Sequence, residues 1–424
     1  MRKILICVLA IMVLFACYVY PRQTTLTIGI FAGSNWDVPN GNSYQVIDTA
    51  IEAFEQSHPN IKVVYQSGIL KEDYSEWLAE SFLEGNEPDV FMVLDKDFNL
   101  LSDIGALKPL DNNIQNDADI SSDTFYSSAI EAGKYKGVQY ALPFESNPTL
   151  MFVNRTLLNA EGISMPDSHW TMQDFYEICD QVTKDTNGDG SLDQFGCYDY
   201  AWKDAMYGYG VRLFNDEGPD CYLNQYEVKE ALRFVQKLDQ LSRNYIITSD
   251  DFDMGRVAFS PMTYAQYRTY KSYPYRVNKY TTFEWDCVPM PSVDGQQNNS
   301  EVASLLFAIS SNSSHSQEAW LFLKQLTMDP EIQSQLLVDS QGIPSLKVAA
   351  QSNELILDAT LENGISIKQL EQVMERGFHA SQFKSYDNVM DLLDSRIHDI
   401  LNNSTDLDIS LMNLQREIKQ YLDR

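Results

Sequence analysis

Basic residues are scarce in this sequence. The 424 residues include 31 lysines and arginines against 60 aspartates and glutamates, which gives a formal net charge of -29. Such an excess of negative charge repels phosphate backbones and anionic headgroups over a Debye length, about 10 Å at 0.1 M salt. We therefore expect no nucleic-acid partner.

The motifs of common hydrolases and nucleotide-binding enzymes are also missing. No GxSxG, HExxH or P-loop occurs, which argues against a serine hydrolase, a zincin or an NTPase. The five histidines stand singly, at His58, His169, His315, His379 and His398. A carboxylate pair for glycoside hydrolysis stays an alternative, although nothing singles out one pair among 60 acids. We expect a binding protein that requires no cofactor.

The six cysteines form no CxxC pair, so a zinc site is not expected. Cys7 and Cys17 fall within the first twenty residues. The other four permit three disulfide pairings, with free buried thiols as the alternative: Cys179, Cys197, Cys221 and Cys287.

One long apolar run stands at the N-terminus. Arg2 and Lys3 precede an unbroken stretch from Ile4 to Ala16, the pattern of a secretory signal. The run ends in "LFAC", which resembles a bacterial lipobox and makes Cys17 the predicted lipidation site. Without cleavage, residues 4–20 are just long enough for a short membrane anchor. We assign residues 1–23 as leader and tether, and either version holds the protein at the outer face of the membrane.

The length of the chain predicts two globular lobes. The N-terminal part reads strand, helix, strand, helix, strand, which indicates an α/β fold. Apolar residues alternate at Leu26, Ile28 and Ile30, then take helical spacing from Val46 to Phe54. A strand is predicted at 61–65, a helix over 74–82, and a strand buried on both faces at 90–94.

The segment "YALPFESNPTLMFVNRTLL" at 140–158 carries prolines on both sides of a polar tetrad, and we interpret it as a crossing between lobes. Beyond it the sequence is rich in helical patterns. Strands are predicted at 256–260 and 284–289, and residues 389–422 have amphipathic helical spacing.

Several segments together resemble the family 1 extracellular solute-binding proteins of bacterial ABC transporters, which capture mostly sugars and oligosaccharides. The resemblance spans roughly residues 24–350, and the segments that carry it are "AIEAFEQSHPNIKVVY", "PDVFMVL" with "GALKPLD", "GKYKGVQYALPFESNPTLMFVNRTLLNAEGI", "HWTMQDFYEICDQVT", "DTNGDGSLDQFG", "FAISSNSSHSQEAWLFLKQLTMDPEIQSQL" and "QGIPSLK".

The resemblance implies a two-lobed, type II-like periplasmic-binding-protein fold that closes by a hinge on a ligand held between the lobes. Crossings are expected near 143–147, 287–291 and 342–345. The N-terminal lobe would hold residues 24–142 and 292–343, and the C-terminal lobe residues 143–291 and 344–424. The expected partners are a carbohydrate ligand and the permease subunits, and we expect the protein to be a monomer.

Candidate ligand-binding residues follow from the chemistry of sugars, whose hydroxyls and apolar ring faces match carboxylates, amides and aromatic rings. In α/β lobes, ligands bind beyond the carboxyl ends of the strands. Trp36 and Asp37 follow the first strand, and Asp95 follows the strand at 90–94. Core packing is the alternative for Trp36, and a solvated loop carboxylate is the alternative for Asp95.

Further candidates lie in the proposed crossing and beyond it. Glu145 and Asn147 are polar residues within an apolar flank, where ligand contact is favoured over hydrogen bonding in the hinge. Trp202 and Tyr207 belong to the aromatic stretch "YDYAWKDAMYGYG", and Tyr264 falls close to the family's aromatic platform. A polyamine, a basic peptide or ferric iron remains an alternative ligand.

"DTNGDGSLDQFG" at 185–196 resembles a calcium loop. Its side-chain oxygens stand at alternate positions, with Gly190 where such a loop turns sharply. Gly196 replaces the usual glutamate at position 12, so a sensor is not expected. We predict a structural Ca²⁺ site, with a metal-free Asx turn as the alternative, formed by Asp185, Asn187, Asp189, Ser191 and Asp193.

Overall fold

The computed structural model describes residues 23–39, 44–215, 220–271, 283–296, 300–352, 365–403 and 406–423. The predicted leader, with Cys17, lies outside these residues. Among the described helices, none has the length and apolar character needed to span a bilayer.

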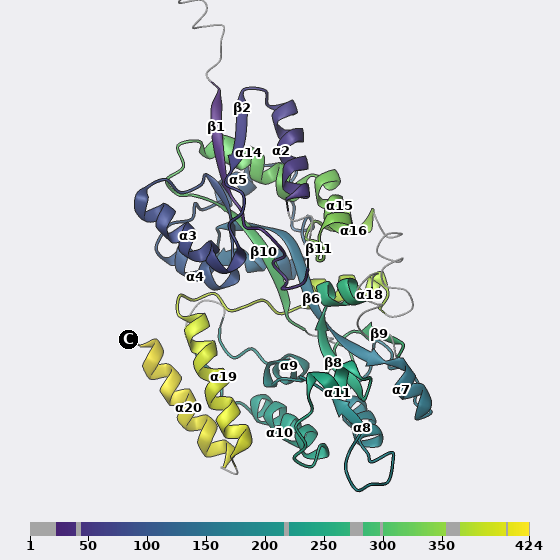
Figure 1. Cartoon of the computed structure of the whole chain (residues 1–424). Coiled ribbons are helices and arrows are strands. Elements are labelled where there is room, and N and C mark those ends of the chain that lie inside the picture. The colour runs from purple at the N-terminus through teal and green to yellow at the C-terminus, as the bar shows by residue number, and fades with distance from the viewer. Residues whose placement is uncertain are drawn as a thin grey trace, which may run out of the picture.

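Two lobes lie one above the other in Figure 1, with the N-terminal residues in the upper lobe. The upper lobe is an α/β unit. It contains β1 (Thr24–Gly29), α2 (Gln45–Ser57), β2 (Ile61–Tyr65), α3 (Lys71–Glu84), β3 (Val90–Val93), α4 (Asp95–Asp103), α5 (Asp111–Gln115), α6 (Ser127–Ala132), β4 (Lys134–Tyr135), β5 (Val138–Gln139), β10 (Val302–Ile309), α14 (Ser316–Met328), α15 (Pro330–Asp339), β11 (Ile343–Pro344) and α16 (Lys347–Gln351).

The predicted pattern of the first ninety residues is confirmed. All the apolar residues from Val46 to Phe54 that suggested a helix are buried along one face of α2. β1 pairs in parallel with β2 and β3, and all four residues of β3 are buried. The parallel strands direct their carboxyl ends toward one edge, where α4 begins at Asp95.

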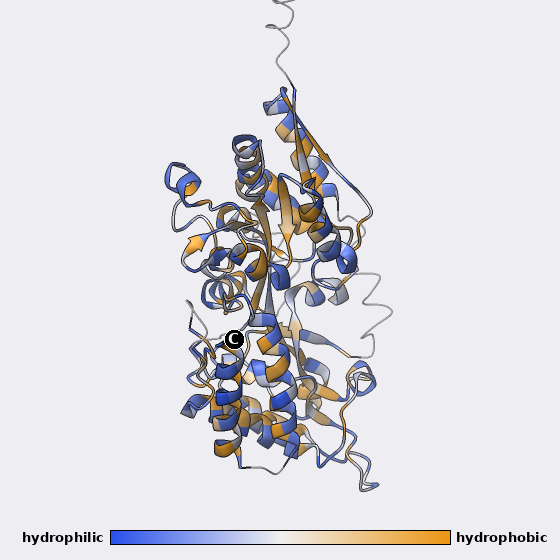
Figure 2. Cartoon of the chain, turned by 90° about the vertical axis from the view of Figure 1, so that its left-hand side faces the viewer, coloured by the Kyte–Doolittle hydropathy of each residue, from blue (hydrophilic) through white to orange (hydrophobic). Residues whose placement is uncertain are grey.

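The lower lobe is rich in helices, as expected. It contains α7 (Arg155–Ala160), α8 (Met172–Val182), β7 (Phe195–Cys197), α9 (Trp202–Gly208), α10 (Tyr226–Leu241), α11 (Ser249–Asp253), β8 (Val257–Thr263), α12 (Tyr264–Lys271), β9 (Trp285–Val288), α19 (Tyr386–Asn402) and α20 (Leu407–Leu422). Its core is separate from that of the upper lobe and includes apolar residues of α8, α10, α19 and α20. Figure 2 shows hydrophilic and hydrophobic residues alternating along these helices, as their amphipathic spacing predicts.

One strand joins the lobes. β6 (Ala141–Asn154) runs through both, and its first half pairs with β10 while its second half pairs with β8 and β9. The strands form one sheet in the order β2-β1-β3-β10-β6-β8-β7, with β9 and β11 also paired to β6. The crossing predicted at 143–147 therefore lies in the middle of an uninterrupted strand.

The lobe boundaries differ from our expectation in two places. Residues 292–296 pack with the lower lobe: Ser292 forms a bridge with Thr171, and Val293 donates to the carbonyl of Gly208. Residues 344–351 pack with the upper lobe, since Leu346 and Ala349 belong to its core and α16 contacts α15. The chain returns to the lower lobe later, between α18 (Ile367–Arg376), which packs on α6, and α19.

The four cysteines of the described residues are free thiols, so none of the three possible disulfide pairings is formed. Cys179, Cys221 and Cys287 are buried, and Cys197 is partly buried. Burial raises the pKa of the Cys179 thiol well above its usual value, which keeps it uncharged.

Candidate functional site

Two small recesses lie where the lobes meet, and both are lined by His379. The first is formed by the start of α4, the start of β10 and residues 379–382. The second is formed by α9, α19 and the segment 211–214. Their volumes are about 30 and 40 Å³, an order of magnitude below the 300–1,000 Å³ of ordinary ligand pockets. We call the two recesses together the inter-lobe cleft.

Two carboxylates line this cleft, and two more lie near it. Asp95 of α4 and Glu301, which directly precedes β10, line the first recess. Asp387 of α19 and Asp204 of α9 line neither recess, but their charges interact with those of Asp95 and Glu301 respectively. The Asp95 side chain is exposed to solvent, but the protein on either side of it restricts its hydration, and this together with the charges of Glu301 and Asp387 raises its pKa to about 7. Desolvation, with a contribution from Glu301, also raises the pKa of Asp204 to about 7.

Aromatic rings line the second recess. The ring of Tyr207 stacks on Phe378, with 5.0 Å between centroids and 25° between planes. The guanidinium of Arg212 lies 5.2 Å from the centre of the Phe378 ring. Trp202 is largely buried, and its indole N–H donates to Asp394 at 2.7 Å. Tyr386 completes the aromatic set.

Asp95, Trp202 and Tyr207, which were predicted from the sequence, are thus brought to the cleft from two lobes. Asp37 is not: its carboxylate is exposed and forms an ion pair with Lys71 at 2.7 Å. Trp36 is packed in the core of the upper lobe, as its alternative interpretation had it.

Glu145 belongs to the hinge and not to the cleft wall. Its side chain is only 3% exposed, and its carboxylate accepts hydrogen bonds from the Ser340 hydroxyl and from the backbone N–H of Gly342 at 2.6 Å. Burial raises the pKa of Glu145, while these bonds, Trp36 and the charge of Arg268 oppose the rise. The Trp36 indole nitrogen forms no hydrogen bond of normal geometry. In this conformation the carboxylate of Glu145 serves the hinge, as the alternative interpretation had it, and ligand contact by Glu145 stays a prediction.

Asn147 and Tyr264 are also internal. The side-chain oxygen of Asn147 accepts from the backbone N–H of Ala265 at 2.9 Å, which ties β6 to the first turn of α12. Tyr264 is fully buried and stacks near Tyr267, with ring centroids 6.5 Å apart. Tyr264 is therefore part of the core in this conformation and not the exposed platform that we expected.

The family of the protein follows from comparison with known sequences. A family model described as bacterial extracellular solute-binding protein matches residues 49–363, well over half of the chain. The chain belongs to this family. It is a family of extracellular binding proteins.

Known proteins similar to this solute-binding protein match most of its length. The maltotriose-binding protein of Pyrococcus abyssi is 22% identical over 400 residues, which are 90% of this chain and 81% of the relative. The cyclic alpha-maltosyl-1,6-maltose binding protein of Arthrobacter globiformis has a similar structure, with a TM-score of 0.77, 15% identity, and coverage of 94% of this chain and 99% of that one. An ABC substrate-binding protein of Listeria monocytogenes in complex with cycloalternan gives a TM-score of 0.69 at 20% identity, over 95% of this chain and 99% of that one.

Several residues in or near the cleft of this solute-binding protein were not predicted from the sequence. Glu301, Asp204, Tyr386 and Asp387 were not singled out. Glu301, just before β10, forms a bridge with Phe378, and this contact places the segment that precedes Tyr386 and Asp387 beside β10. No local sequence pattern reveals this contact. Asp204 had a signal, since it stands within the aromatic stretch that we had marked, two residues after Trp202.

The crowding of acids around Asp95 makes stability depend on pH. The folded pKa of about 7 exceeds the usual 3.8, so the folded state binds more protons than the unfolded state between these values. Ionised Asp95 therefore lowers the free energy of unfolding, fully above pH 7 and progressively less as the pH falls from 7 toward 3.8. We expect Asp95→Asn to raise the melting temperature at about pH 8 and to raise it much less at about pH 5.

The charges that face Asp95 are Glu301, Asp387 and, with the opposite sign, Lys71. Asp73→Asn is a suitable control, because Asp73 is an exposed acid in the first turn of another helix, α3. The change in melting temperature of Asp73→Asn measures the loss of a negative charge at a helix N-terminus without the repulsion that surrounds Asp95. An equal gain for Asp95→Asn at both pH values would contradict the proposed repulsion.

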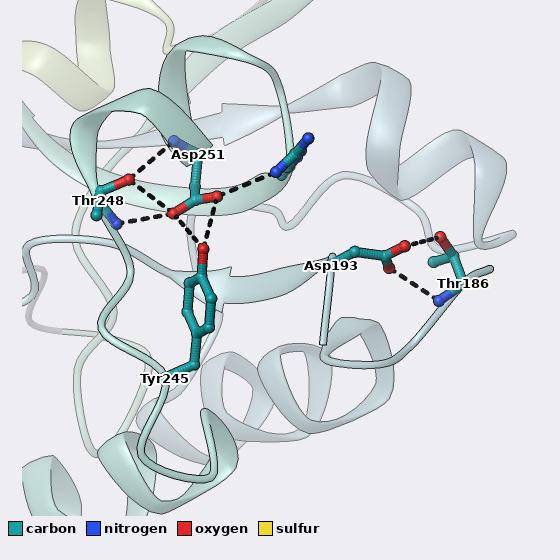
Figure 3. Close-up of polar contacts among 6 residues, drawn as sticks. Thr186, Asp193, Tyr245, Thr248 and Asp251 are labelled. Carbon is teal, nitrogen blue, oxygen red and sulfur yellow. Dashed lines mark hydrogen bonds and ion pairs between the residues drawn. The ribbon is translucent and has the colours of Figure 1, made fainter. Parts of the chain in front are cut away.

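The loop at 185–193 of the solute-binding protein is a series of Asx-type turns. Asp185 accepts from the backbone N–H groups of Gly188 and Gly190, at 2.6 and 2.7 Å. Asp193 accepts from the N–H and the hydroxyl of Thr186, at 2.8 and 2.9 Å (Figure 3). Asn187 and Asp189 likewise accept from backbone N–H groups two residues ahead.

These turns leave few free oxygen atoms to coordinate a calcium ion. Each of the oxygens just described already accepts a bond from the loop, and the described residues include no group of three His, Cys, Asp or Glu placed to hold a metal. The Ca²⁺ site therefore stays a prediction. If it forms, millimolar calcium should raise the melting temperature relative to excess chelator, and Asp189→Ala should abolish the difference. Identical melting curves would leave the Asx turns alone.

Proposed function

We propose that this solute-binding protein captures a sugar or an oligosaccharide in the inter-lobe cleft and delivers it to the permease subunits of an ABC importer. The observation that carries the proposal is the convergence of aromatic rings and carboxylates from both lobes on the cleft. Tyr207 and Phe378 offer flat apolar faces, while Asp95 and Glu301 offer acceptors for hydroxyl groups. The names of the relatives, which bind maltotriose and other oligosaccharides, support the same class of ligand.

Ligand entry requires the lobes to move apart. The recesses of the cleft are too small for even a short oligosaccharide, so the ligand enters an opened form and the lobes close on it. The ligand stabilises the closed form because it contacts both lobes at once. Since no step of this cycle needs chemistry, the protein acts as a binding protein and not as an enzyme.

A thermal-shift screen tests the proposal on the full mature protein. Maltotriose, mannotriose and cycloalternan should be compared with spermidine and a basic tripeptide. We expect at least one sugar to raise the melting temperature, since a hundredfold excess over Kd adds about 2.7 kcal/mol to the free energy of unfolding. Long incubation should return the sugar intact by mass spectrometry. A hydrolysed sugar would indicate a glycoside-active enzyme instead.

A cationic ligand is the second candidate, because one observation favours it. Asp95 and Glu301 line the cleft and interact by charge with Asp387 and Asp204, and an amine bound in the cleft would lower this mutual repulsion. A melting shift with spermidine and none with the sugars would support this candidate and contradict the first.

We also propose that the mature protein is tethered outside the cytoplasmic membrane. The "LFAC" sequence supports a lipid on Cys17, and an uncleaved anchor at residues 4–20 is the alternative. Cys17→Ser should release the protein into the medium or leave an unprocessed precursor. An N-terminal peptide of the native protein without acyl mass would refute the lipid.

A further inference from the structure

A cavity of about 990 Å³ lies in the lower lobe, and its walls share no residue with the inter-lobe cleft. It is bounded by the end of α10 and the loop that follows, by residues 196–201 at the end of β7 and just beyond it, and by the last turn of α19. α19 runs away from the upper lobe in Figure 1, so this last turn lies at the far end of the molecule. The volume is at the upper end of the range of ordinary ligand pockets.

The chemistry of this cavity resembles that of a carbohydrate site. No lysine or arginine is among the described residues that line it, which disfavours an anionic ligand. The wall carries two carboxylates, three phenol rings and several side-chain amides, among them Asp199, Asp239, Tyr198, Tyr200, Tyr245, Asn244 and Asn402. Aromatic faces beside hydroxyl-bonding oxygens and amides are the combination that suits a sugar ring.

Tyr245 is an exposed ring that is held in place. Its side chain is 43% exposed, and its ring stacks on Phe195 with 4.7 Å between centroids and 19° between planes. Its hydroxyl donates to both oxygens of Asp251 at 3.3 Å (Figure 3). Stacking covers one face of the ring and leaves the other available, and the fixed position lowers the entropy lost when a ligand stacks there.

Asp251 is itself fixed, so the support of Tyr245 continues below the surface. Thr248 donates to Asp251 through its backbone N–H and its hydroxyl, at 3.0 and 2.8 Å, in the capping box of α11. Arg256 contacts the same carboxylate at 3.4 Å. Together these contacts fix the Asp251 carboxylate and, through it, the hydroxyl of Tyr245 (Figure 3).

Unusual backbone conformations gather around the same cavity. Asp199, Arg243 and Asn244 have φ values of 59°, 50° and 68°, and they are three of the five non-glycine residues with positive φ in the described part of the chain. Asp199 and Asn244 line the cavity, and Arg243 stands next to Asn244. Residues in this region of φ/ψ space cluster at ligand sites, where the surrounding structure holds them in place.

We propose that this cavity is a second carbohydrate-binding site, with Tyr245 as the stacking platform and Asp239 as a hydroxyl acceptor. The cavity stands outside the hinge, so lobe closure would neither create nor bury this site. It would hold a sugar without transport, for example one end of a long saccharide whose other end is held by a neighbouring molecule.

The test measures binding stoichiometry by equilibrium dialysis with labelled maltotriose and mannotriose at millimolar concentration, using the full mature protein. We expect wild type to bind two molecules of at least one sugar. Tyr245→Ser should weaken one of the two sites at least tenfold and leave the other unchanged. Tyr226→Ser is the matched control, because Tyr226 is 67% exposed at the start of α10 and does not line the cavity. Asp239→Asn provides a second variant in case Tyr245→Ser lowers stability.

The two sites can be separated. Tyr207→Ala should affect only the cleft, so sugar that remains bound to this variant and is lost in Tyr245→Ser supports the second site even if the cleft takes another ligand. A single site in wild type that neither Tyr245→Ser nor Asp239→Asn changes would overturn the proposal, as would equal losses in Tyr245→Ser and Tyr226→Ser. Failure of both sugars to bind outside the cleft would overturn it as well.

Discussion

Replacing Arg268 with alanine is expected to lower the free energy of unfolding by about 3 to 5 kcal/mol, which would be the largest loss from a single polar substitution at the hinge. The guanidinium donates to the carbonyl oxygens of Leu337, Ser340 and Gly342, at 2.6, 3.0 and 3.2 Å. Its positive charge also favours the ionised form of Glu145, which is buried beside the same segment. Alanine would leave these carbonyls without their donor and the carboxylate without its nearest positive charge.

Urea denaturation of the Arg268 variants measures this loss. Arg268→Lys should recover part of the stability, because lysine keeps the charge but cannot reach three carbonyls with a rigid fork. Arg233→Ala serves as the control, since Arg233 is exposed on α10 and its ion pairs should contribute less than about 1 kcal/mol. A loss below about 1 kcal/mol for Arg268→Ala would show that water replaces the guanidinium at the hinge.

The second large effect is expected on ligand affinity. Tyr207→Ala should weaken binding of the sugar identified in the thermal-shift screen at least roughly 30-fold, or about 2 kcal/mol, as for an aromatic at the centre of an interface. The ring lines the cleft and is already aligned by stacking on Phe378. Isothermal titration calorimetry measures the change.

Tyr207→Phe separates the ring from its hydroxyl. If stacking dominates, the phenylalanine variant should bind nearly as well as wild type. The melting temperature without ligand should be recorded for each variant, because the alanine also removes the contact with Phe378. Unchanged sugar affinity in Tyr207→Ala would place the ligand elsewhere.

Local patterns predicted the upper lobe well. The apolar spacing from Val46 to Phe54 and the continuous apolar stretch at 90–94 report directly which face of an element is buried, and both predictions are confirmed. The crossing at 143–147 was recognisable because polar residues there interrupt an apolar strand. The exact lobe boundaries were not, since they depend on which lobe residues 292–296 and 344–351 pack against.

The candidate site was only partly predictable, for a related reason. Asp95 follows a buried strand, and this rule brings it to the cleft. Glu145 has the same polarity, but its carboxylate meets Ser340 and Gly342, almost two hundred residues later in the chain. Tyr264 directly follows β8, but α12, which starts at that residue, turns its ring into the core in this conformation, and the sequence position alone did not reveal this. Sequence rules show where polar and aromatic residues stand along the elements, but not which distant residues they bond to or pack against.

The continuity of β6 has a mechanical consequence. Because this strand is hydrogen-bonded to neighbours in both lobes, the lobes cannot swing on a slack linker. Their relative rotation has to be taken up as elastic twist of the shared sheet, spread over many backbone bonds that each change slightly. Such a spring stores energy in proportion to the square of the angle and returns the lobes to one rest position. The backbone amides of residues 145–147 should then exchange with deuterium as slowly as those of the core whether or not ligand is bound, while the recesses on either side open and close.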